Sequence, residues 1–373
     1  MKTEQRAFFS DSTQMSPIDD GTIGLVVTSP PYPMIRMWDD GFCRHPSIKQ
    51  ALLKGNGGLA FERMHRQLDR VWDELLRVVM PGGIVCINIG DAVRTLKDEF
   101  ALYPNHSRIL SHMTTIGFTN LPNILWRKPT NAPTKFMGSG MLPPGAYVTL
   151  EHEHILIFRK GGKRTFNSAA NKAVRRQSAF FWEERNRWFS DVWMDLRGTR
   201  QNTDDERLRQ RTAAFPFEMA YRLIVMFSIM GDTVLDPFLG TGTTLFAAAA
   251  AGRNGIGFEL DAAFRSVIAS GWPQAIQQGR RRLQDRFSDH AAFVHEHQTA
   301  GKAVKYTNKA YGFPVMTRQE TELMIPWPTT VAETEPDCFS VAYDLPKLSD
   351  ITKTATVEQP SLTQSTGQLK LFD

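Results

Sequence analysis

The sequence predicts an α/β fold in which helices cover a mostly parallel, Rossmann-like sheet. Apolar runs such as Ile23-Gly24-Leu25-Val26-Val27 are typical of buried strands, and they alternate with stretches of helical periodicity. One apolar run leads through a glycine turn, Gly240-Thr241-Gly242, into an alanine-rich helix and then into another strand. Strand, glycine turn, helix and strand together form the unit that binds nucleotides in open α/β sheets.

In the first 160 residues, strands and helices are expected to alternate. Apolar residues at helical spacing predict a helix over 61–79, ended by Pro81-Gly82-Gly83, and a second helix over 105–116. Residues 33–60 are rich in glycine, proline and charge, so they are expected to form a mobile surface loop or a lid over a site. Strands are expected at residues 7–12, 23–27, 84–89, 123–126 and 154–158.

In the second half, Phe215-Pro216 is expected to open a helix. A basic helix is expected over 264–287, interrupted near Pro273, and short strands are expected within 298–328. Residues 329–373 are rich in Thr, Ser, Pro, Glu and Gln, which predicts a poorly ordered end. Strands are expected at 233–236 and 255–260, with a helix over 245–251 between them.

Composition limits the class of protein. The 373 residues are 42% hydrophobic and carry a net charge of +5, which is compatible with a nucleic-acid partner. The three cysteines, Cys43, Cys86 and Cys338, have no metal-binding spacing, which indicates a reducing compartment and favours neither zinc nor disulfides. We see no signal peptide and no apolar stretch long enough for a bilayer, so we expect no membrane partner.

Residues 159–212 combine many Arg and Lys residues with interleaved aromatics, among them Phe181, Trp188 and Trp193. A solvated, irregular insertion is one interpretation. A nucleic-acid-facing segment is better supported, because Arg and Lys neutralise phosphates and reach guanine edges.

The glycine turn indicates a nucleoside-containing ligand. Gly240 and Gly242 let backbone amides approach a ligand at a helix N-terminus, and Glu259, about 20 residues later, matches the acid that binds ribose hydroxyls. A third glycine and the Walker lysine are absent, so NAD and ATP are less favoured. S-adenosylmethionine, a nucleoside without a pyrophosphate, fits best; a turn with no ligand is the alternative.

A second motif, Thr28-Ser29-Pro30-Pro31-Tyr32, follows the strand 23–27 at the edge of the sheet where ligands bind. The prolines fix the backbone and lack N–H donors, so their carbonyls remain free to accept. A hydroxyl, free carbonyls and an aromatic ring suit a planar group that bears an amine. On its own, this motif is equally compatible with a simple strand-ending turn.

Together these motifs resemble the β-class amino-group DNA methyltransferases. Val27 to Tyr32 matches the catalytic motif in its Ser-Pro-Pro-Tyr form, and it precedes the cofactor motif, as in that class. The resemblance spans about residues 7–270 and implies a circularly permuted S-adenosylmethionine-dependent methyltransferase fold. It implies that the cofactor is bound by Asp11, Thr28, Phe215, Pro216, Asp236, Pro237, Phe238, Gly240, Gly242, Thr243, Thr244 and Glu259.

The resemblance also divides the chain. Residues 1–159 form the catalytic half, 160–212 an inserted target-recognition region, 213–289 the cofactor-binding half and 290–373 a C-terminal extension. The protein is then expected in a prokaryotic cytoplasm, as part of a restriction–modification system with a cognate endonuclease that acts on the same site.

The implied reaction is methylation of cytosine N4 in duplex DNA, on a base flipped out of the helix. Ser29 Oγ and the Pro30 carbonyl would accept the amine hydrogens, with Pro31 rigidifying the loop, Tyr32 stacking on the base and the released proton passing to water. The serine form of the motif favours cytosine, although adenine N6 stays open. An RNA substrate and a DNA-binding protein that binds the cofactor without reacting are further alternatives.

Three other polar residues lie close to this edge. His152 and His154 share a face of a strand, but with no third ligand nearby we expect no metal, and a packing role is favoured over a place in the pocket wall. Asp91 follows the strand 84–89, where it either caps a turn or lines the site.

Overall fold

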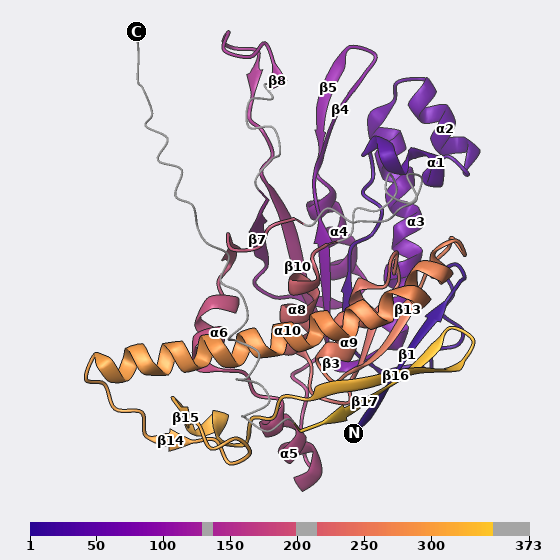
Figure 1. Ribbon diagram of the computed structural model, residues 1–373. Coiled ribbons are helices and arrows are strands. Elements are labelled where there is room, and N and C mark those ends of the chain that lie inside the picture. The colour runs from indigo at the N-terminus through magenta and orange to yellow at the C-terminus, as the bar shows by residue number, and fades with distance from the viewer. Residues whose placement is uncertain (129–136, 199–214, 346–373) are drawn as a thin grey trace.

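The computed structural model describes residues 1–128, 137–198 and 215–345, and one eleven-stranded sheet forms its centre (Figure 1). The strand order is β11-β7-β10-β3-β2-β12-β13-β1-β17-β16, with β6 paired to β10 beside this path. The strands are β1 Lys2–Phe8, β2 Ile23–Thr28, β3 Val79–Ile89, β6 Phe118–Asn120, β7 Ile124–Arg127, β10 His152–Lys160, β11 Val192–Trp193, β12 Thr233–Asp236, β13 Asn254–Phe258, β16 Trp327–Glu335 and β17 Cys338–Asp344.

The five central strands, β3, β2, β12, β13 and β1, are parallel, whereas β10 and β17 flank them in antiparallel orientation. The expected mostly parallel α/β sheet is therefore confirmed. The two halves of the chain meet at its centre, where Val26 of β2 lies opposite Leu235 of β12. Their carboxyl ends, and hence the two motifs, lie at one edge of the sheet.

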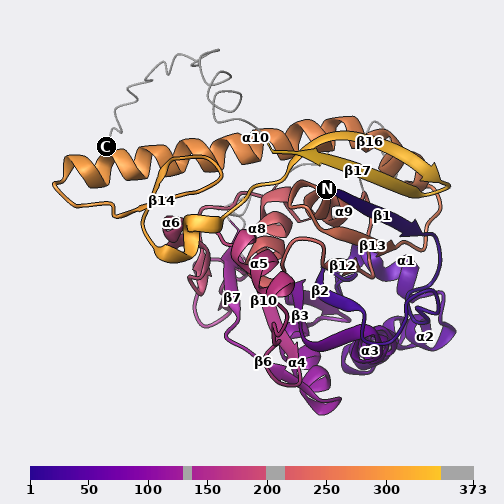
Figure 2. The same ribbon diagram turned by 90° about the horizontal axis from the view of Figure 1, so that it is seen from below.

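Helices form a layer on each face (Figure 2). Alternating residues of β2 divide the core: Val26 packs on the α3 side, and Leu25 and Val27 pack on the α8 and α9 side. On the first face lie α3 Gly57–Val78 and α4 Asn105–Thr115. On the second lie α8 Phe217–Phe227, α9 Thr243–Ala250 and the long α10 Phe264–Thr299, which runs along α9 and β16.

Smaller elements lie outside the sheet. Among the described residues, two hairpins extend from the edge that carries the motifs: β4 Ala92–Leu96 with β5 Glu99–Tyr103, and β8 Met137–Gly138 with β9 Ala146–Tyr147 (Figure 1). A third pair, β14 Tyr306–Thr307 with β15 Pro314–Val315, follows α10. None of the helices described here has both the length and the apolar character needed to cross a membrane.

The segment 33–60 is not the expected loop. It folds into η1 Arg36–Trp38, α1 Asp39–Phe42 and α2 Pro46–Leu53, followed by the first turn of α3. Pro46 occupies the first turn of α2, where its missing N–H has no cost. These helices are too short for periodicity to reveal them.

The expected break at Pro273 is also wrong, because α10 continues through it as one helix of 36 residues. Proline in a helix interior loses a hydrogen bond and costs about 3 kcal/mol. The neighbouring Trp272, Ala275 and Ile276 are buried in the core beneath the helix, and their burial offsets that cost.

Three expectations about strands are wrong. The first strand, expected over 7–12, is β1 Lys2–Phe8, and residues 9–12 follow it as a loop. Pro81-Gly82-Gly83 does not separate α3 from a strand, because β3 already begins at Val79 and Gly82, with φ of +82°, lies within it beside an irregular pairing with β2. Residues 327–344 are not disordered but form the β16–β17 hairpin, which extends the sheet beyond β1. Residues 346–373 lie outside the described part.

The basic and aromatic segment contains α5 Ala169–Gln177, α6 Trp182–Trp188 and β11. Phe181, Trp188 and Trp193 are at most 1% exposed, so these aromatics belong to the core. The expectation that they face nucleic acid is therefore wrong. Arg164 forms a two-pronged ion pair with Asp232. Residues 199–212 of this segment lie outside the described part.

Candidate active site

The loops after β1, β2, β12 and β13 enclose a cavity of about 560 Å³ at the carboxyl edge of the sheet. Its lining includes seven residues that the sequence nominated: Asp11, Ser29, Pro31, Pro237, Phe238, Gly240 and Glu259. The helical segment 36–45 supplies a further wall through Met37, Trp38 and Phe42. The predicted lid segment therefore covers the same cavity that the two motifs border.

The glycine turn presents backbone toward this cavity. Gly240 has φ of +55°, and a Cβ placed on it would meet no other protein atom within 4 Å, because the cavity lies there. The Gly240 N–H donates to Glu259 Oε2 at 2.8 Å, and the Asp261 N–H donates to Oε1 at 2.9 Å. Burial raises the pKa of Glu259 despite these bonds. Gly242, with φ of +90°, lies behind the turn against Phe246 as the N-cap of α9.

Asp236 joins the two motifs instead of lining the cavity. Its carboxylate accepts the hydroxyls of Thr28 and Thr244, both at 2.6 Å, and the backbone N–H of Phe238 at 3.0 Å. Burial raises the pKa of Asp236 to about 6. Because Thr28 immediately precedes Ser29, these hydrogen bonds, which we call the Asp236 clasp, fix the Ser29–Tyr32 loop relative to the glycine turn.

The hydroxyl of Ser29 belongs to a chain of hydrogen bonds. Ser29 Oγ donates to Tyr32 Oη at 3.2 Å, and Tyr32 Oη donates to Glu153 Oε2 at 2.9 Å. Asn88 Nδ2 donates to both Tyr32 Oη and Glu153 Oε2, at 2.9 and 2.7 Å, and Lys128 Nζ donates to Glu153 Oε1 at 2.8 Å. Burial and the nearby Glu153 charge hold the pKa of Tyr32 well above its usual value, so Tyr32 stays protonated.

A buried amide holds the backbone that follows Tyr32. Asn105 Nδ2 donates to the carbonyls of Pro33 and Gly90, at 3.2 and 2.9 Å, and its Oδ1 lies 2.9 Å from His65 Nε2. Burial lowers the pKa of His65 to about 4, so the imidazole is neutral at pH 7. This network ties the loop after Tyr32 to the end of β3.

Nine of the sixteen nominated residues, all of them in the described part of the chain, do not line the cavity: besides Thr28, Asp236, Gly242 and Thr244, these are Phe215, Pro216, Thr243, Pro30 and Tyr32. Phe215 and Pro216 are buried at the start of α8, and Pro216 is its N-cap. Thr243 is the first residue of α9, Pro30 is buried, and Tyr32 points its hydroxyl toward Glu153. Phe215 directly follows residues 199–214, whose placement is outside the described part.

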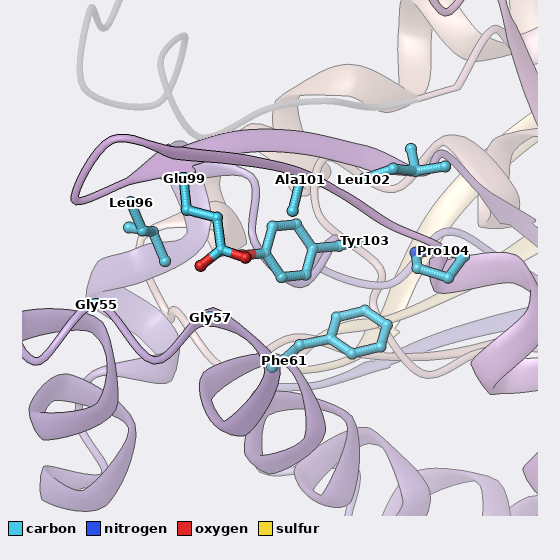
Figure 3. A pocket seen from close by; sticks show the side chains of 10 residues that line it. Gly55, Gly57, Phe61, Leu96, Glu99, Ala101, Leu102, Tyr103 and Pro104 are labelled. Carbon is cyan, nitrogen blue, oxygen red and sulfur yellow. The ribbon is translucent and has the colours of Figure 1, made fainter.

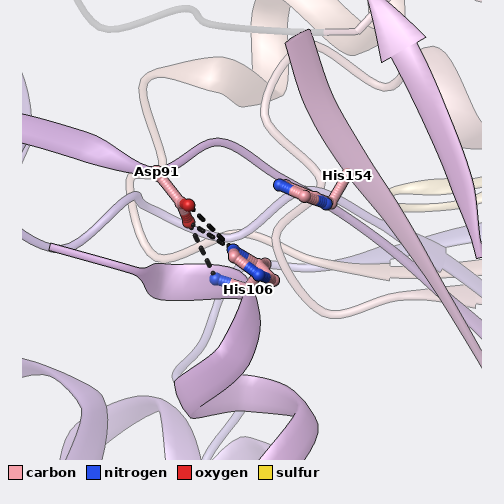
Figure 4. Close-up of side chains that lie close together, drawn as sticks. All are labelled: Asp91, His106 and His154. Carbon is pink, nitrogen blue, oxygen red and sulfur yellow. Dashed lines mark hydrogen bonds and ion pairs between the residues drawn. The ribbon is translucent and has the colours of Figure 1, made fainter. Parts of the chain in front are cut away.

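Asp91, His106 and His154 lie close enough together to suggest a metal site (Figure 4). However, the two imidazoles are stacked with centroids 3.9 Å apart and planes 14° apart. Imidazole binds metals in its ring plane, so stacked parallel rings do not direct their lone pairs at one ion.

Hydrogen bonding satisfies this cluster without a metal. Asp91 accepts from His106 Nδ1 and from the His106 N–H, and so caps α4. Burial would raise the pKa of Asp91, but these bonds lower it. Burial and the adjacent His106 lower the pKa of His154 to about 4. The cap and packing roles are the ones this geometry favours.

A second, smaller cavity of about 300 Å³ lies between the turn before α3 and strand β5 (Figure 3). The rings of Phe61 and Tyr103 border it, and a Cβ on Gly57 would lie 1.9 Å from the Tyr103 hydroxyl. Burial and nearby Glu99 raise the pKa of Tyr103. This cavity contains none of the residues nominated from the sequence.

Several residues of the site had no recognisable signal in the sequence. Glu153 was one member of a run of alternating acids and histidines, Asn88 ended a strand, and Lys128 began a loop. They are brought to Tyr32 by the pairing of β10 with β3 and β7. Trp38 could not be assigned to the site because it lies in the segment 33–60, which was expected to be a loop.

Known proteins share this sequence and fold. The model of the DNA methylase family, which covers N6 and N4 methyltransferases, matches residues 23–270. The type II methyltransferase M.MthZI of Methanothermobacter thermautotrophicus is 50% identical over 345 residues, 92% of this chain and 96% of that protein. The type II methyltransferase M.MjaI of Methanocaldococcus jannaschii is 48% identical over 278 residues, 71% of this chain and 90% of that protein.

A solved structure agrees with these relatives. TTHA0409 from Thermus thermophilus, determined in complex with S-adenosyl-L-methionine, is 31% identical with a TM-score of 0.57, covering 73% of this chain and 94% of that one. The mostly parallel sheet is thus that of the Rossmann-like S-adenosylmethionine-dependent methyltransferase fold. With two thirds of its length matched by the family model and a relative of 50% identity along nearly the whole chain, the protein belongs to the DNA methylase family.

Proposed function

We propose that this DNA methylase transfers the methyl group of S-adenosylmethionine to N4 of cytosine in duplex DNA. The observation that carries the proposal is Ser29, in a Ser-Pro-Pro-Tyr loop, at the wall of the cavity that the glycine turn borders. The names of the relatives, which are type II methyltransferases, support a role in protecting DNA from a cognate endonuclease in a prokaryotic cytoplasm.

The residues around the cavity fit this cofactor. The volume of about 560 Å³ lies within the roughly 300–1,000 Å³ usual for small-molecule sites. Glu259 is placed for ribose hydroxyls, Gly240 leaves room for a ligand against the backbone, and Asp11 and Phe238 border the same space. When bound, S-adenosylmethionine supplies an electrophilic methyl group on a sulfonium centre.

The chain supplies orientation at the target amine. The lone pair of a cytosine amine is delocalised into the ring, so acceptors on its hydrogens favour the form that attacks the methyl group. Ser29 Oγ donates its hydrogen to Tyr32, which leaves its lone pairs available to accept one amine hydrogen. We assign the other amine hydrogen to the carbonyl of Pro30, whose neighbours Ser29 and Pro31 both line the cavity. The Asp236 clasp holds this loop against the glycine turn.

Duplex DNA must present the base outside the helix, because a paired base does not reach a cavity at the edge of a sheet. The hairpins β4–β5 and β8–β9 extend from this edge of the sheet (Figure 1). We propose that these hairpins contact the duplex and that residues 160–212 contribute to target recognition. The net charge of +5 favours such a partner.

N6-adenine methylation is the second candidate, because the matching family covers both kinds of enzyme. The experiment is to methylate unmodified DNA with the purified protein and to analyse nucleoside digests by mass spectrometry. We expect N4-methylcytosine from the wild type and none from Ser29→Ala, whereas Ser266→Ala, an exposed serine on α10, should behave as the wild type.

Other results separate the alternatives. N6-methyladenine alone would reassign the base and leave the enzyme class intact. Methylation of RNA but not DNA would reassign the polymer. Cofactor binding without methylation of either polymer would indicate a non-catalytic DNA-binding protein, and undiminished methylation by Ser29→Ala would remove Ser29 from the mechanism.

A further inference from the structure

We propose that Glu153 accepts the proton released from the target amine, through a relay of Tyr32 and Ser29. The relay rests on the proposed function, since it begins at the amine that Ser29 contacts. It replaces the expected loss of this proton to water. Its basis is the continuous set of hydrogen bonds from Ser29 Oγ to Tyr32 Oη and from Tyr32 Oη to Glu153 Oε2.

The direction of each hydrogen bond in this chain is determined. Asn88 Nδ2 has only hydrogens to give, so Tyr32 Oη accepts from it. A carboxylate oxygen offers only lone pairs, so Tyr32 Oη donates to Glu153 Oε2. Tyr32 Oη then has one lone pair left, and Ser29 Oγ fills it as a donor. Ser29 is thereby left with acceptor capacity alone toward the cavity it lines.

This polarity is the one that a proton relay needs. As the new carbon–nitrogen bond forms, the amine nitrogen becomes cationic and one N–H bond breaks, with its electron pair staying on nitrogen. The proton moves to Ser29 Oγ while the Ser29 proton moves to Tyr32 Oη and the Tyr32 proton moves to Glu153 Oε2. Ser29 and Tyr32 end neutral, and Glu153 ends protonated.

The surroundings of Glu153 suit a terminal acceptor. Its side chain is 13% exposed, and Lys128 Nζ, which is 47% exposed, contacts the other carboxylate oxygen at 2.8 Å. Lys128 donates to the carboxylate oxygen that Tyr32 does not contact, and its exposure places this end of the relay beside solvent. Asn88, whose exposed fraction is 3%, fixes the relative positions of Glu153 and Tyr32 by donating a hydrogen bond to each of them.

The test compares Glu153→Gln with Glu151→Gln. Glutamine keeps the size of Glu153 and an acceptor for Tyr32, but it is not basic. Glu151 is two residues earlier, pairs with Arg127 at the surface and is 45% exposed, so its substitution removes the same charge outside the relay. Single-turnover methyl transfer to unmodified duplex DNA is measured across pH, together with binding of S-adenosylmethionine and of DNA.

We expect the wild-type rate to fall toward acid, because a protonated carboxyl group cannot accept the proton that the relay delivers. Glu153→Gln should lower the rate about 10²-fold or more at neutral pH, lose that acid limb and bind both ligands as the wild type does. Glu151→Gln should keep both the rate and the limb.

A second readout needs no turnover. The titration of Tyr32 is followed by NMR of carbon-labelled tyrosine without ligands, with the resonance assigned by Tyr32→Phe. Because Glu153 raises the pKa of Tyr32, Glu153→Gln should lower it, and Glu151→Gln should not.

The outcomes are distinguishable. An active wild type with a Glu153→Gln variant that retains rate and acid limb overturns the relay but not the proposed function. A slower variant with an unchanged acid limb assigns Glu153 a structural role and also overturns it. A wild type that methylates no DNA overturns the proposed function, and the relay with it.

Discussion

At the scale of single residues, two glycines have left-handed backbone, but only one of them borders the large cavity. Comparing them distinguishes the effect of backbone strain from the effect of ligand contact. Gly240 and Gly231 have φ of +55° and +80°, and a Cβ on either would meet no other protein atom within 4 Å. Only Gly240 lines the large cavity. We expect alanine at each site to reduce the free energy of unfolding by about 1–2 kcal/mol, and only Gly240→Ala to weaken S-adenosylmethionine binding.

Urea unfolding and isothermal titration calorimetry measure these two effects separately. If Gly240→Ala and Gly231→Ala bound the cofactor equally well, the open space at Gly240 would not be the cofactor site. If Gly231→Ala alone were destabilised, the strain argument would be wrong.

The same scale shows what the sequence could predict. Ser29, Gly240 and Glu259 were recognisable because each lies in a contiguous motif after an apolar strand, and the structure gathers all three at one cavity. Glu153 and Asn88 were not, because they lie 121 and 56 residues from Tyr32 and are brought to it only by strand pairing. The clasp of Thr28 and Thr244 on Asp236 needed the same knowledge of pairing.

At the scale of elements, a buried ion pair fixes α6 to α10. Arg286 contacts both oxygens of Glu184, at 2.6 and 2.7 Å, and each side chain is 4% exposed. Glu184→Gln would leave the Arg286 charge buried without a counter-charge, so we expect the free energy of unfolding to fall by about 3–5 kcal/mol. Asp289→Asn is the control, because its pair with Arg187 is 3.7 Å long and about half exposed.

For Asp289→Asn we expect a change within about 0.5 kcal/mol in the same urea titrations. A loss at Glu184 no larger than this would show that α6 is held by its aromatic residues alone. The pair also explains a wrong expectation: α6 belongs to a segment whose arginines and aromatics suggested nucleic acid, yet its Glu184 and Trp188 face the core.

Elements were predictable where one periodicity extended over many residues. The apolar residues at helical spacing from Phe61 to Val79 predicted α3, whose observed range is Gly57–Val78, to within a few residues at each end. The sequence did not predict the β16–β17 hairpin, because β16 buries few of its residues and its polar composition is typical of a disordered segment. Its partner β17 buries Val341 and Tyr343, and pairing with β1 supplies the remaining stabilisation.

At the scale of the molecule, the half of the chain that carries Ser29 precedes the half that carries Gly240, yet the two form one sheet. Pairing of β2 with β12 and a shared core make each half incomplete alone. The positions of Ser29 and Gly240 depend on this pairing and not on which half comes first. The ends of the described chain also meet, since the Tyr343 N–H donates to the Met1 carbonyl at 3.1 Å.

A circular permutant tests this directly. In this permutant a short Gly/Ser linker joins residue 345 to Met1, and the chain opens between Gly161 and Gly162. The comparison chain simply ends at residue 345. We expect the permutant to fold and to bind S-adenosylmethionine as tightly as the comparison chain does. The opening lies in an exposed turn after β10, where a Cβ on either glycine would meet nothing within 4 Å. Opening between Val26 and Val27 instead interrupts β2 and should abolish cooperative unfolding, because those buried residues pair with β3 and β12. Urea unfolding and calorimetric titration of the three chains decide the question: failure of the first permutant, while the shortened chain folds, would mean that chain order itself is needed to assemble the site.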